Sequence, residues 1–257
     1  MVFLGTTRMR IVVAALAFLF ISSVCCNDLV QAVDSRSLLE VGKFSAAQSG
    51  KALPEGWKSL TFKKVPKHTM YEIVKDGADT VIRASSDDSA SGLIKEVTID
   101  PKEYPVVRWR WKIDHLLVHS DVSRKEGDDY PARLYITFAY DPDKVGLAKR
   151  FKYKAGRVLF GEIPIAALNY IWDTKAPLGS IVDNAYTDFA KMVVVESGHE
   201  HVGGWVYEER DVLEDYRKAF GDDPPMINGV AIMTDTDNTK EQAVAYYGDI
   251  QFVRASR

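Results

Sequence analysis

The fold of this chain is decided by the stretch Val106-Val107-Arg108-Trp109-Arg110-Trp111-Lys112-Ile113. After its first residue, apolar and basic residues alternate strictly. Successive side chains of a β-strand point to opposite faces, so this period of two predicts a strand that buries one face. We expect Trp109 and Trp111 to lie in the core, and Arg108 and Arg110 to lie on a polar face.

Residues 133–140 repeat this alternation, with apolar residues at every second position from Leu134. Arg133 and Tyr135 fall on the opposite face. If this strand pairs with 106–113, the two polar faces form one surface. Guanidinium groups bind carboxylate or sulfate groups through paired hydrogen bonds, and a tyrosine ring offers a flat surface to a sugar. The predicted ligand contacts on this surface are Arg108, Arg110, Arg133 and Tyr135.

Short apolar stretches separated by turn residues continue along most of the chain, which is typical of consecutive antiparallel strands. The further expected strands are 57–64, 69–75, 80–84, 93–99, 167–172, 191–196, 226–234 and 243–253. Many short strands with few helices indicate a mainly β protein. We predict a two-sheet antiparallel β-sandwich of the jelly-roll type rather than a βαβ arrangement.

Two segments change to a helical period and are expected as insertions in the sandwich. Asp141-Pro142 is a helix start, and apolar residues then recur at three or four positions as far as Val158. A shorter helix is expected at 212–220, with Asp211 as its N-cap and Gly221 as its stop.

The N-terminal segment is typical of an export signal. Arg8 and Arg10 precede an uncharged apolar run, and small residues follow as far as Ala32. This run would extend only about 20 Å as a helix, whereas a bilayer core is about 30 Å thick. We therefore predict a signal peptide at 1–32 and a single domain at 33–257 that works in the periplasm or is secreted.

The composition excludes several classes of site and partner. Both cysteines, Cys25 and Cys26, lie in the predicted signal peptide, so the predicted mature chain has no thiol for a disulfide, a thiolate metal site or a nucleophile. A lipid anchor on one of these cysteines is the alternative to signal cleavage. The formal net charge is −3, with both signs interspersed, and this excludes the basic excess of a nucleic-acid-binding protein.

The densest polar cluster is Gly127-Asp128-Asp129-Tyr130-Pro131-Ala132-Arg133, at the start of an expected strand. Its carboxylates would order the rim of the ligand-binding surface. They would serve instead as acid and base in a hydrolase or lyase, a role that Glu209 would also suit. A salt-bridged turn is the purely structural interpretation. The cluster adds Asp128 and Asp129 to the predicted ligand-binding residues.

Asp235 and Asp237 begin a loop that resembles the start of a calcium-binding loop. An EF-hand would require a glycine in place of Lys240 and a glutamate in place of Tyr246, so that motif is excluded. An Asx-rich hairpin loop is one interpretation. The other is a structural calcium site of a different kind, with Asp235, Asp237 and Asp249 as ligands and no other cofactor.

His199 and His201 lie on one side of an extended segment, a spacing that would suit zinc or copper. No third ligand is evident nearby, and the surrounding glycines indicate a loop. We expect these histidines to be surface residues.

Several motifs together resemble a bacterial family of proteins of unknown function, DUF3047, over about residues 41–252. The motifs are Trp109-Arg110-Trp111-Lys112, Lys125-Glu126-Gly127-Asp128-Asp129-Tyr130-Pro131-Ala132-Arg133, Asn169-Tyr170-Ile171-Trp172, Val195-Glu196-Ser197-Gly198, Gly229-Val230-Ala231-Ile232-Met233-Thr234-Asp235-Thr236-Asp237 and Tyr246-Tyr247-Gly248-Asp249-Ile250. The resemblance implies a single extracytoplasmic domain and carries no activity with it.

The sequence therefore predicts an exported β-sandwich that binds a carbohydrate or another cell-envelope ligand on a polar sheet face, with acidic saccharides preferred. One alternative is a hydrolase or lyase acting on polysaccharide, and another is an envelope assembly protein that binds no small ligand. An enzyme needs two carboxylates converging on a cleft, whereas a binding protein needs only a lined face.

Overall fold

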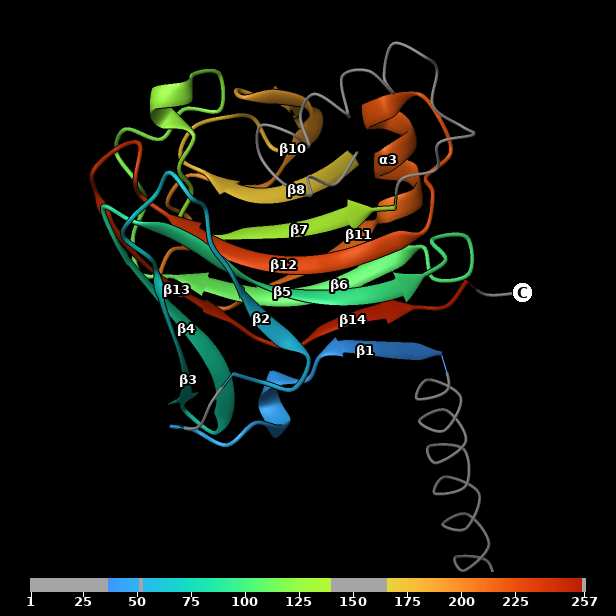
Figure 1. Ribbon diagram of the computed structural model, residues 1–257, viewed down its shortest axis with the longest axis horizontal. Coiled ribbons are helices and arrows are strands. Elements are labelled where there is room, and N and C mark those ends of the chain that lie inside the picture. The colour runs from blue at the N-terminus through green and yellow to red at the C-terminus, as the bar shows by residue number, and fades with distance from the viewer. Residues whose placement is uncertain (1–36, 51–52, 140–165, 256–257) are drawn as a thin grey trace, which may run out of the picture. The chain divides into compact units, whose positions relative to one another are not determined.

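The stretch 106–113 is strand β6 (Val106–Ile113) in the computed structural model, which describes residues 37–50, 53–139 and 166–255 (Figure 1). Its alternation appears directly in the burial of its side chains. Trp109 and Trp111 are buried, whereas Arg108 is exposed and Arg110 is half-buried. The predicted facing of this strand is confirmed.

The described strands form two sheets of seven strands each. Sheet A contains β1 (Leu38–Gly42), β14 (Ile250–Val253), β6, β13 (Gln242–Tyr247), β4 (Asp79–Asp87) and β3 (Met70–Asp76) in that order, and β11 (Val206–Asp211) pairs with β6. Sheet B contains β2 (Trp57–Leu60), β5 (Ala90–Ile99), β12 (Ile227–Asp235), β7 (Arg133–Phe138), β8 (Ala166–Asp173), β10 (Thr187–Ser197) and β9 (Ile181–Asn184). Two short 3₁₀ turns lie at Phe44–Ala46 and Lys125–Gly127. The prediction of a mainly β protein with two sheets is confirmed.

The pairing differs from the prediction in two respects. Strands β6 and β7 lie in different sheets, because β7 pairs with β12 and β8 whereas β6 pairs with β11, β13 and β14. Strands β8 and β10 are parallel, so the expectation of a wholly antiparallel fold is wrong. The reason is β9, which is antiparallel to β10 and turns the chain round before β10 pairs with β8.

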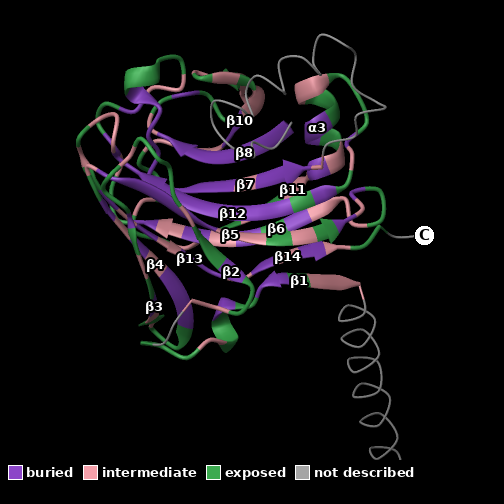
Figure 2. Cartoon of the chain, in the orientation of Figure 1, coloured by how far each residue is buried: buried purple, intermediate pink, exposed green. Residues whose placement is uncertain are grey.

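The main core lies between the inner faces of the two sheets. The Trp109 ring of sheet A lies 5.2 Å from the Tyr170 ring of sheet B, and Trp111 lies 6.3 Å from Trp172, measured between ring centroids. Figure 2 shows that β7, β8 and β12 are buried along almost their whole length. The three strands β7, β8 and β12 of sheet B are therefore covered on both faces, whereas β6 is covered on one.

Among the described residues there is one α-helix, α3 (Val212–Phe220), as predicted. The Asp211 carboxylate accepts a hydrogen bond from the Glu214 amide at 2.8 Å, and Gly221 ends the helix with a left-handed conformation, φ 74°. The other predicted helix, 142–158, and the predicted signal peptide lie outside the described residues. The described residues from Leu39 onward form one compact unit. No helix in the described part of the chain is long and apolar enough to cross a membrane.

Candidate functional site

The predicted ligand-binding surface is divided between the two sheets. Arg108 and Arg110 lie on the outer face of sheet A, whereas Arg133 and Tyr135 belong to sheet B. The expectation that they share one surface is wrong, because it depended on a pairing of β6 with β7. The two halves have different surroundings and are described separately.

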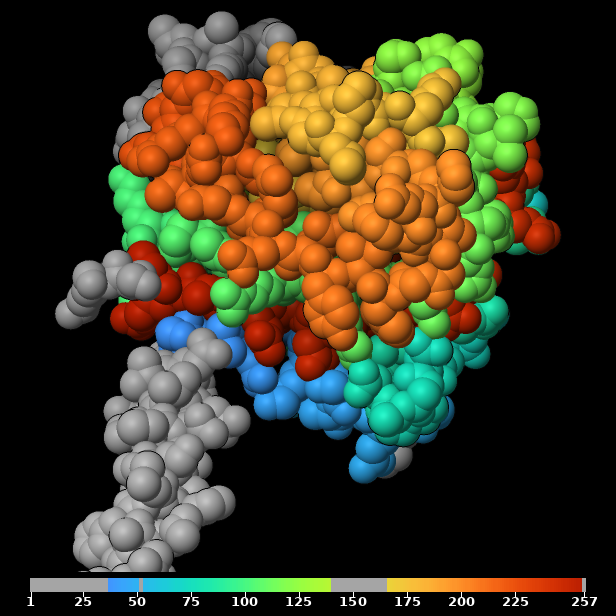
Figure 3. Space-filling model, turned by 180° about the vertical axis from the view of Figure 1, so that it is seen from behind, coloured from blue at the N-terminus to red at the C-terminus, as the bar shows by residue number. Residues whose placement is uncertain are grey.

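The outer face of sheet A contains a groove of about 330 Å³ between β6, β11 and β14. Figure 3 shows this side of the molecule, with the orange segment around β11 against the green of β6 and the red of β14. Tyr207, opposite Arg110 in the strand register, is 73% exposed. The polar side chains along the groove are Arg108, Arg110, Glu209, Asp249 and Gln251.

Arg110 is held across the groove by contacts on several sides. Its guanidinium lies 4.6 Å from the centroid of the Trp205 ring and donates hydrogen bonds to the Tyr207 hydroxyl at 3.3 Å and to Asp79 at 2.7 Å. Gly248, between β13 and β14, makes room for this side chain. A Cβ atom there would lie 2.4 Å from Nε and 2.5 Å from Cγ of Arg110.

Each basic side chain of β6 is paired with a carboxylate. Arg108 binds Glu209 at 2.6 Å, and Lys112 binds Asp76 at 2.6 Å. The hydrogen bond from Lys112 is the main reason that the pKa of Asp76 is lowered. Because Arg110 is paired as well, the groove has no row of unpaired cations. The expected preference for acidic saccharides loses its physical basis here.

Arg133 is buried, with 2% of its surface exposed, and the prediction that it faces solvent is wrong. Its guanidinium binds Asp235, with Nε 2.7 Å from Oδ1, and donates to the Asp128 carbonyl at 2.5 Å and to the Tyr135 hydroxyl at 3.1 Å. The ring of Tyr130 lies 4.4 Å from it. The loop before β7 thus folds over this end of sheet B and covers a face that alternation alone assigns to solvent.

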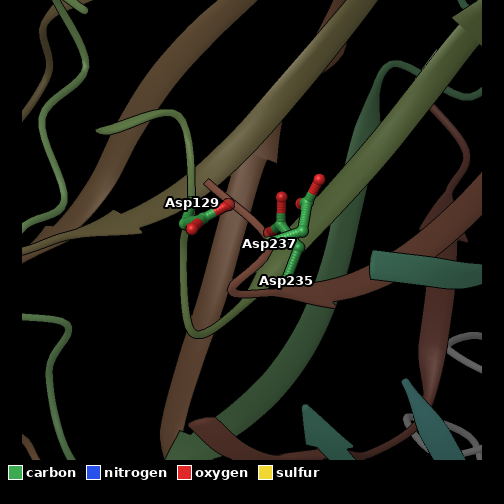
Figure 4. Close-up of side chains that lie close together, drawn as sticks. All are labelled: Asp129, Asp235 and Asp237. Atoms are coloured by element: carbon green, nitrogen blue, oxygen red, sulfur yellow. The ribbon is translucent and has the colours of Figure 1, made fainter. Parts of the chain in front are cut away.

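Three carboxylates meet beside this arginine, and Figure 4 shows them pointing toward one another. Oxygen atoms of Asp129, Asp235 and Asp237 lie within 4.8 Å of one another. Asp249 is elsewhere and accepts hydrogen bonds from the amide and hydroxyl of Ser45 at 2.8 and 2.5 Å. The predicted metal ligands Asp235 and Asp237 are therefore brought together, and Asp129 stands where Asp249 was expected.

The electrostatics of this acidic cluster are unbalanced. Asp128, Asp129 and Asp235 are buried and Asp237 is half-buried, while Arg133 is the basic side chain bound among them. Burial raises the pKa of Asp128, and burial followed by repulsion from Asp129 raises that of Asp237. Carboxylate oxygens in this arrangement suit a hard cation such as calcium.

The histidine pair does not form a metal centre. His201 Nδ1 lies 3.0 Å from Glu196, and within the described part of the chain the aspartate trio is the only group of three close acidic, histidine or cysteine ligands. The surface position expected for His199 and His201 is confirmed, since both are exposed.

Comparison with known families gives a direct result. The model of the family described as "Protein of unknown function (DUF3047)" matches residues 55–251, more than half of the chain. The chain belongs to this family. The resemblance in its motifs is thus confirmed, and the DUF3047 match spans every strand from β2 to β13. No curated protein matches the chain.

Solved structures similar to this DUF3047 protein share little sequence with it. The family 11 carbohydrate-binding module of the Clostridium thermocellum cellulase Lic26A-Cel5E is 10% identical, with 85% of this chain and 95% of that chain covered and a TM-score of 0.39. The carbohydrate recognition domain of Emp47p is 12% identical, with 87% and 99% covered and a TM-score of 0.44. The K1 cleaved adhesin domain of Lys-gingipain from Porphyromonas gingivalis W83 is 10% identical, with 86% and 99% covered and a TM-score of 0.37.

Sequence reasoning did not assign Tyr207 and Trp205 to the binding surface. The alternation of Tyr207 and Glu209 on one face with Val206 and Glu208 on the other was a local signal for β11. Nothing local indicates that β11 pairs with β6, because almost a hundred residues separate them. The groove therefore becomes visible only in the folded molecule.

Proposed function

We propose that this protein binds a saccharide in the groove on the outer face of sheet A. The observation that carries the proposal is Tyr207, whose exposed ring stands beside Arg108 and Arg110 on a concave, polar surface. An exposed aromatic ring supplies a flat apolar surface, and the surrounding groups supply directed hydrogen bonds.

The pairing of charges favours a neutral saccharide. Arg108 with Glu209, and Arg110 with Asp79, present donors and acceptors side by side without a large net charge. Sugar hydroxyl groups both donate and accept, so such pairs suit them better than they suit a carboxylate or sulfate. Gln251, opposite Arg108 in the register, adds an amide of the same dual character.

The test is a binding screen of residues 33–257 on immobilised neutral and acidic polysaccharides. We expect retention on a neutral polysaccharide and at least a tenfold loss of affinity in Tyr207→Ala, since stacking of a flat ring on an aromatic side chain contributes about 1–3 kcal/mol for a nucleic-acid base. Tyr186→Ala is the matched control, because Tyr186 is also exposed, at 56%, but belongs to the β9–β10 turn. Equal loss in both variants, or no retention at all, would refute the proposal.

We also propose the finer fold and the location that the sequence predicts. The domain would be a jelly-roll sandwich, exported by the segment 1–32 and active in the periplasm or outside the cell. N-terminal sequencing of the protein from fractionated cells tests the export and the cleavage of the segment 1–32. A start near Val33 in the soluble extracytoplasmic fraction is expected, and an intact N-terminus in the membrane fraction would contradict it.

A further inference from the structure

A second hollow, of about 560 Å³, lies on the same outer face of sheet A. It is formed by β3, β4 and β13, at the opposite side of the sheet from β11. The side chains that matter for its chemistry are Lys67, His68, Met70, Arg83, Ser85 and His115. Its volume falls in the range of small-molecule sites, about 300–1,000 Å³.

This hollow contains polar groups without partners. The Ser85 hydroxyl oxygen is buried and has no hydrogen-bond partner, a state that costs about 1–3 kcal/mol if no ligand or water satisfies it. The exposed His68 side chain likewise has no bonding partner in the described part of the chain. The His68 ring is therefore open to a ligand, and the Ser85 hydroxyl is an unsatisfied group in the wall of the hollow.

The charges in the second hollow are paired, as they are in the groove beside Tyr207. Lys67 binds Asp88 at 2.6 Å, and Arg83 binds Glu72 at 3.2 Å. The two hollows therefore present the same chemistry, which is hydroxyl and amide hydrogen bonding with little net charge.

A row of three side chains lies between the two hollows. Lys112 of β6, Tyr246 of β13 and Arg83 of β4 are register partners on one face, and the Lys112 ammonium lies 4.3 Å from the centroid of the Tyr246 ring. Neighbouring strands are about 4.8 Å apart, so β11 and β3, which are four strand spacings apart, are separated by about 19 Å across the sheet. That separation is too great for a single sugar ring to span both hollows and is suited to a chain of several sugar units.

We propose that the hollow at His68 and Ser85 is a second subsite of the binding face. The ligand is then an extended neutral oligosaccharide or polysaccharide that crosses the strands of sheet A from Tyr207 to His68. This inference rests on the proposed function, because Tyr207 provides the first subsite.

The experiment compares a disaccharide with a hexasaccharide by isothermal titration calorimetry. The probes are β-1,4-linked glucose oligomers as the neutral series and oligogalacturonides as the acidic series. We expect the wild-type protein to bind the neutral hexasaccharide about tenfold or more tightly than the disaccharide, which corresponds to one or two additional hydrogen bonds. We expect His68→Ala to remove this difference and to leave disaccharide binding unchanged.

His199→Ala is the matched control, since His199 is an exposed histidine on the loop after β10, away from both hollows. Equal affinity of the wild-type protein for both lengths, with no effect of His68→Ala, would overturn the second subsite and leave the proposed function intact. Failure of the wild-type protein to bind any of the four probes would overturn both proposals. Tighter binding of the acidic series than of the neutral series would contradict the neutral ligand in both proposals.

Discussion

Trp109 and Arg110 are adjacent in sequence and have opposite surroundings. The Trp109 ring packs edge-on against Trp111, with centroids 5.3 Å apart, and faces Tyr170 across the core. Trp109→Ala would leave a large cavity and should lower the free energy of unfolding by about 3–5 kcal/mol. Arg110→Ala, which removes a half-buried ion pair and the contact with the Trp205 ring, should cost less, about 1–2 kcal/mol. Chemical denaturation of both variants checks this, and equal denaturation midpoints would contradict the assigned facing.

Arg133 has a structural role that its place in an alternating pattern does not reveal. Removal of its guanidinium in Arg133→Ala would leave Asp235 and Asp128 buried without their counterion, so we expect a loss of about 3–5 kcal/mol in unfolding free energy. Arg108→Ala is the control, because Arg108 forms an exposed pair with Glu209 and should cost less than about 1 kcal/mol. Thermal and denaturant unfolding of both variants measure these two losses of stability. An unchanged melting temperature for Arg133→Ala would show that the cluster tolerates the loss.

At the scale of single elements, the residues at the two ends of α3 are sufficient to predict where this helix begins and ends. Asp211→Ala removes the acceptor for the Glu214 amide and should cost about 1 kcal/mol. Lys218→Ala, which breaks an exposed ion pair with Glu214 on the same helix, should cost less than about 0.5 kcal/mol. Equal melting temperatures for the two variants would show that the cap contributes nothing.

The strands show how far an element can be predicted in isolation. The alternation in β6 and β7 correctly places Trp109 and Leu134 in the core. The same alternation cannot identify the sheet that each strand joins, since every strand of this period presents the same hydrogen-bonding edges. Nor can the alternation show that the loop before β7 covers Arg133, a residue that the period of two places in solvent.

At the scale of the whole molecule, the unbalanced acidic cluster predicts a response to calcium. A cation bound by Asp129, Asp235 and Asp237 would offset buried negative charge and would stabilise the folded state by mass action. We expect millimolar calcium to raise the melting temperature of chelator-treated protein at neutral pH. Asp237→Asn should reduce this shift, whereas Asp249→Asn should not. Asp249 is bound to Ser45 and lies away from the three clustered aspartates. Absence of a shift in the wild-type protein would show that the loop is an Asx-rich turn and not a calcium site.

A second response of the whole molecule concerns pH. Burial, and then the nearby Glu196, raises the pKa of Glu208 to about 7, and its carboxyl group accepts a hydrogen bond from the Trp111 indole at 3.2 Å. The stability that Glu208 contributes is fully present below its unfolded pKa of about 4.3 and is lost as the pH rises through about 7.

Glu208→Gln should therefore remove this part of the pH dependence, by an amount on the order of 2 kcal/mol between pH 5 and pH 8. The measurement is the melting temperature across that range, with Glu209→Gln as the neighbouring exposed control. Identical slopes for the wild-type and Glu208→Gln proteins would contradict the assignment.

The sequence by itself determined the period of the strands, the buried face of β6 and both ends of α3. These features depend on residues only a few positions apart, so local spacing contains the necessary information. The family was also recognisable from its motifs. Only the tertiary structure decided that Tyr207 stands beside Arg110, that Asp129 joins Asp235, and that Arg133 is buried. Those contacts join segments about a hundred residues apart, and the pairing of strands and the covering of a sheet face are properties of the complete fold.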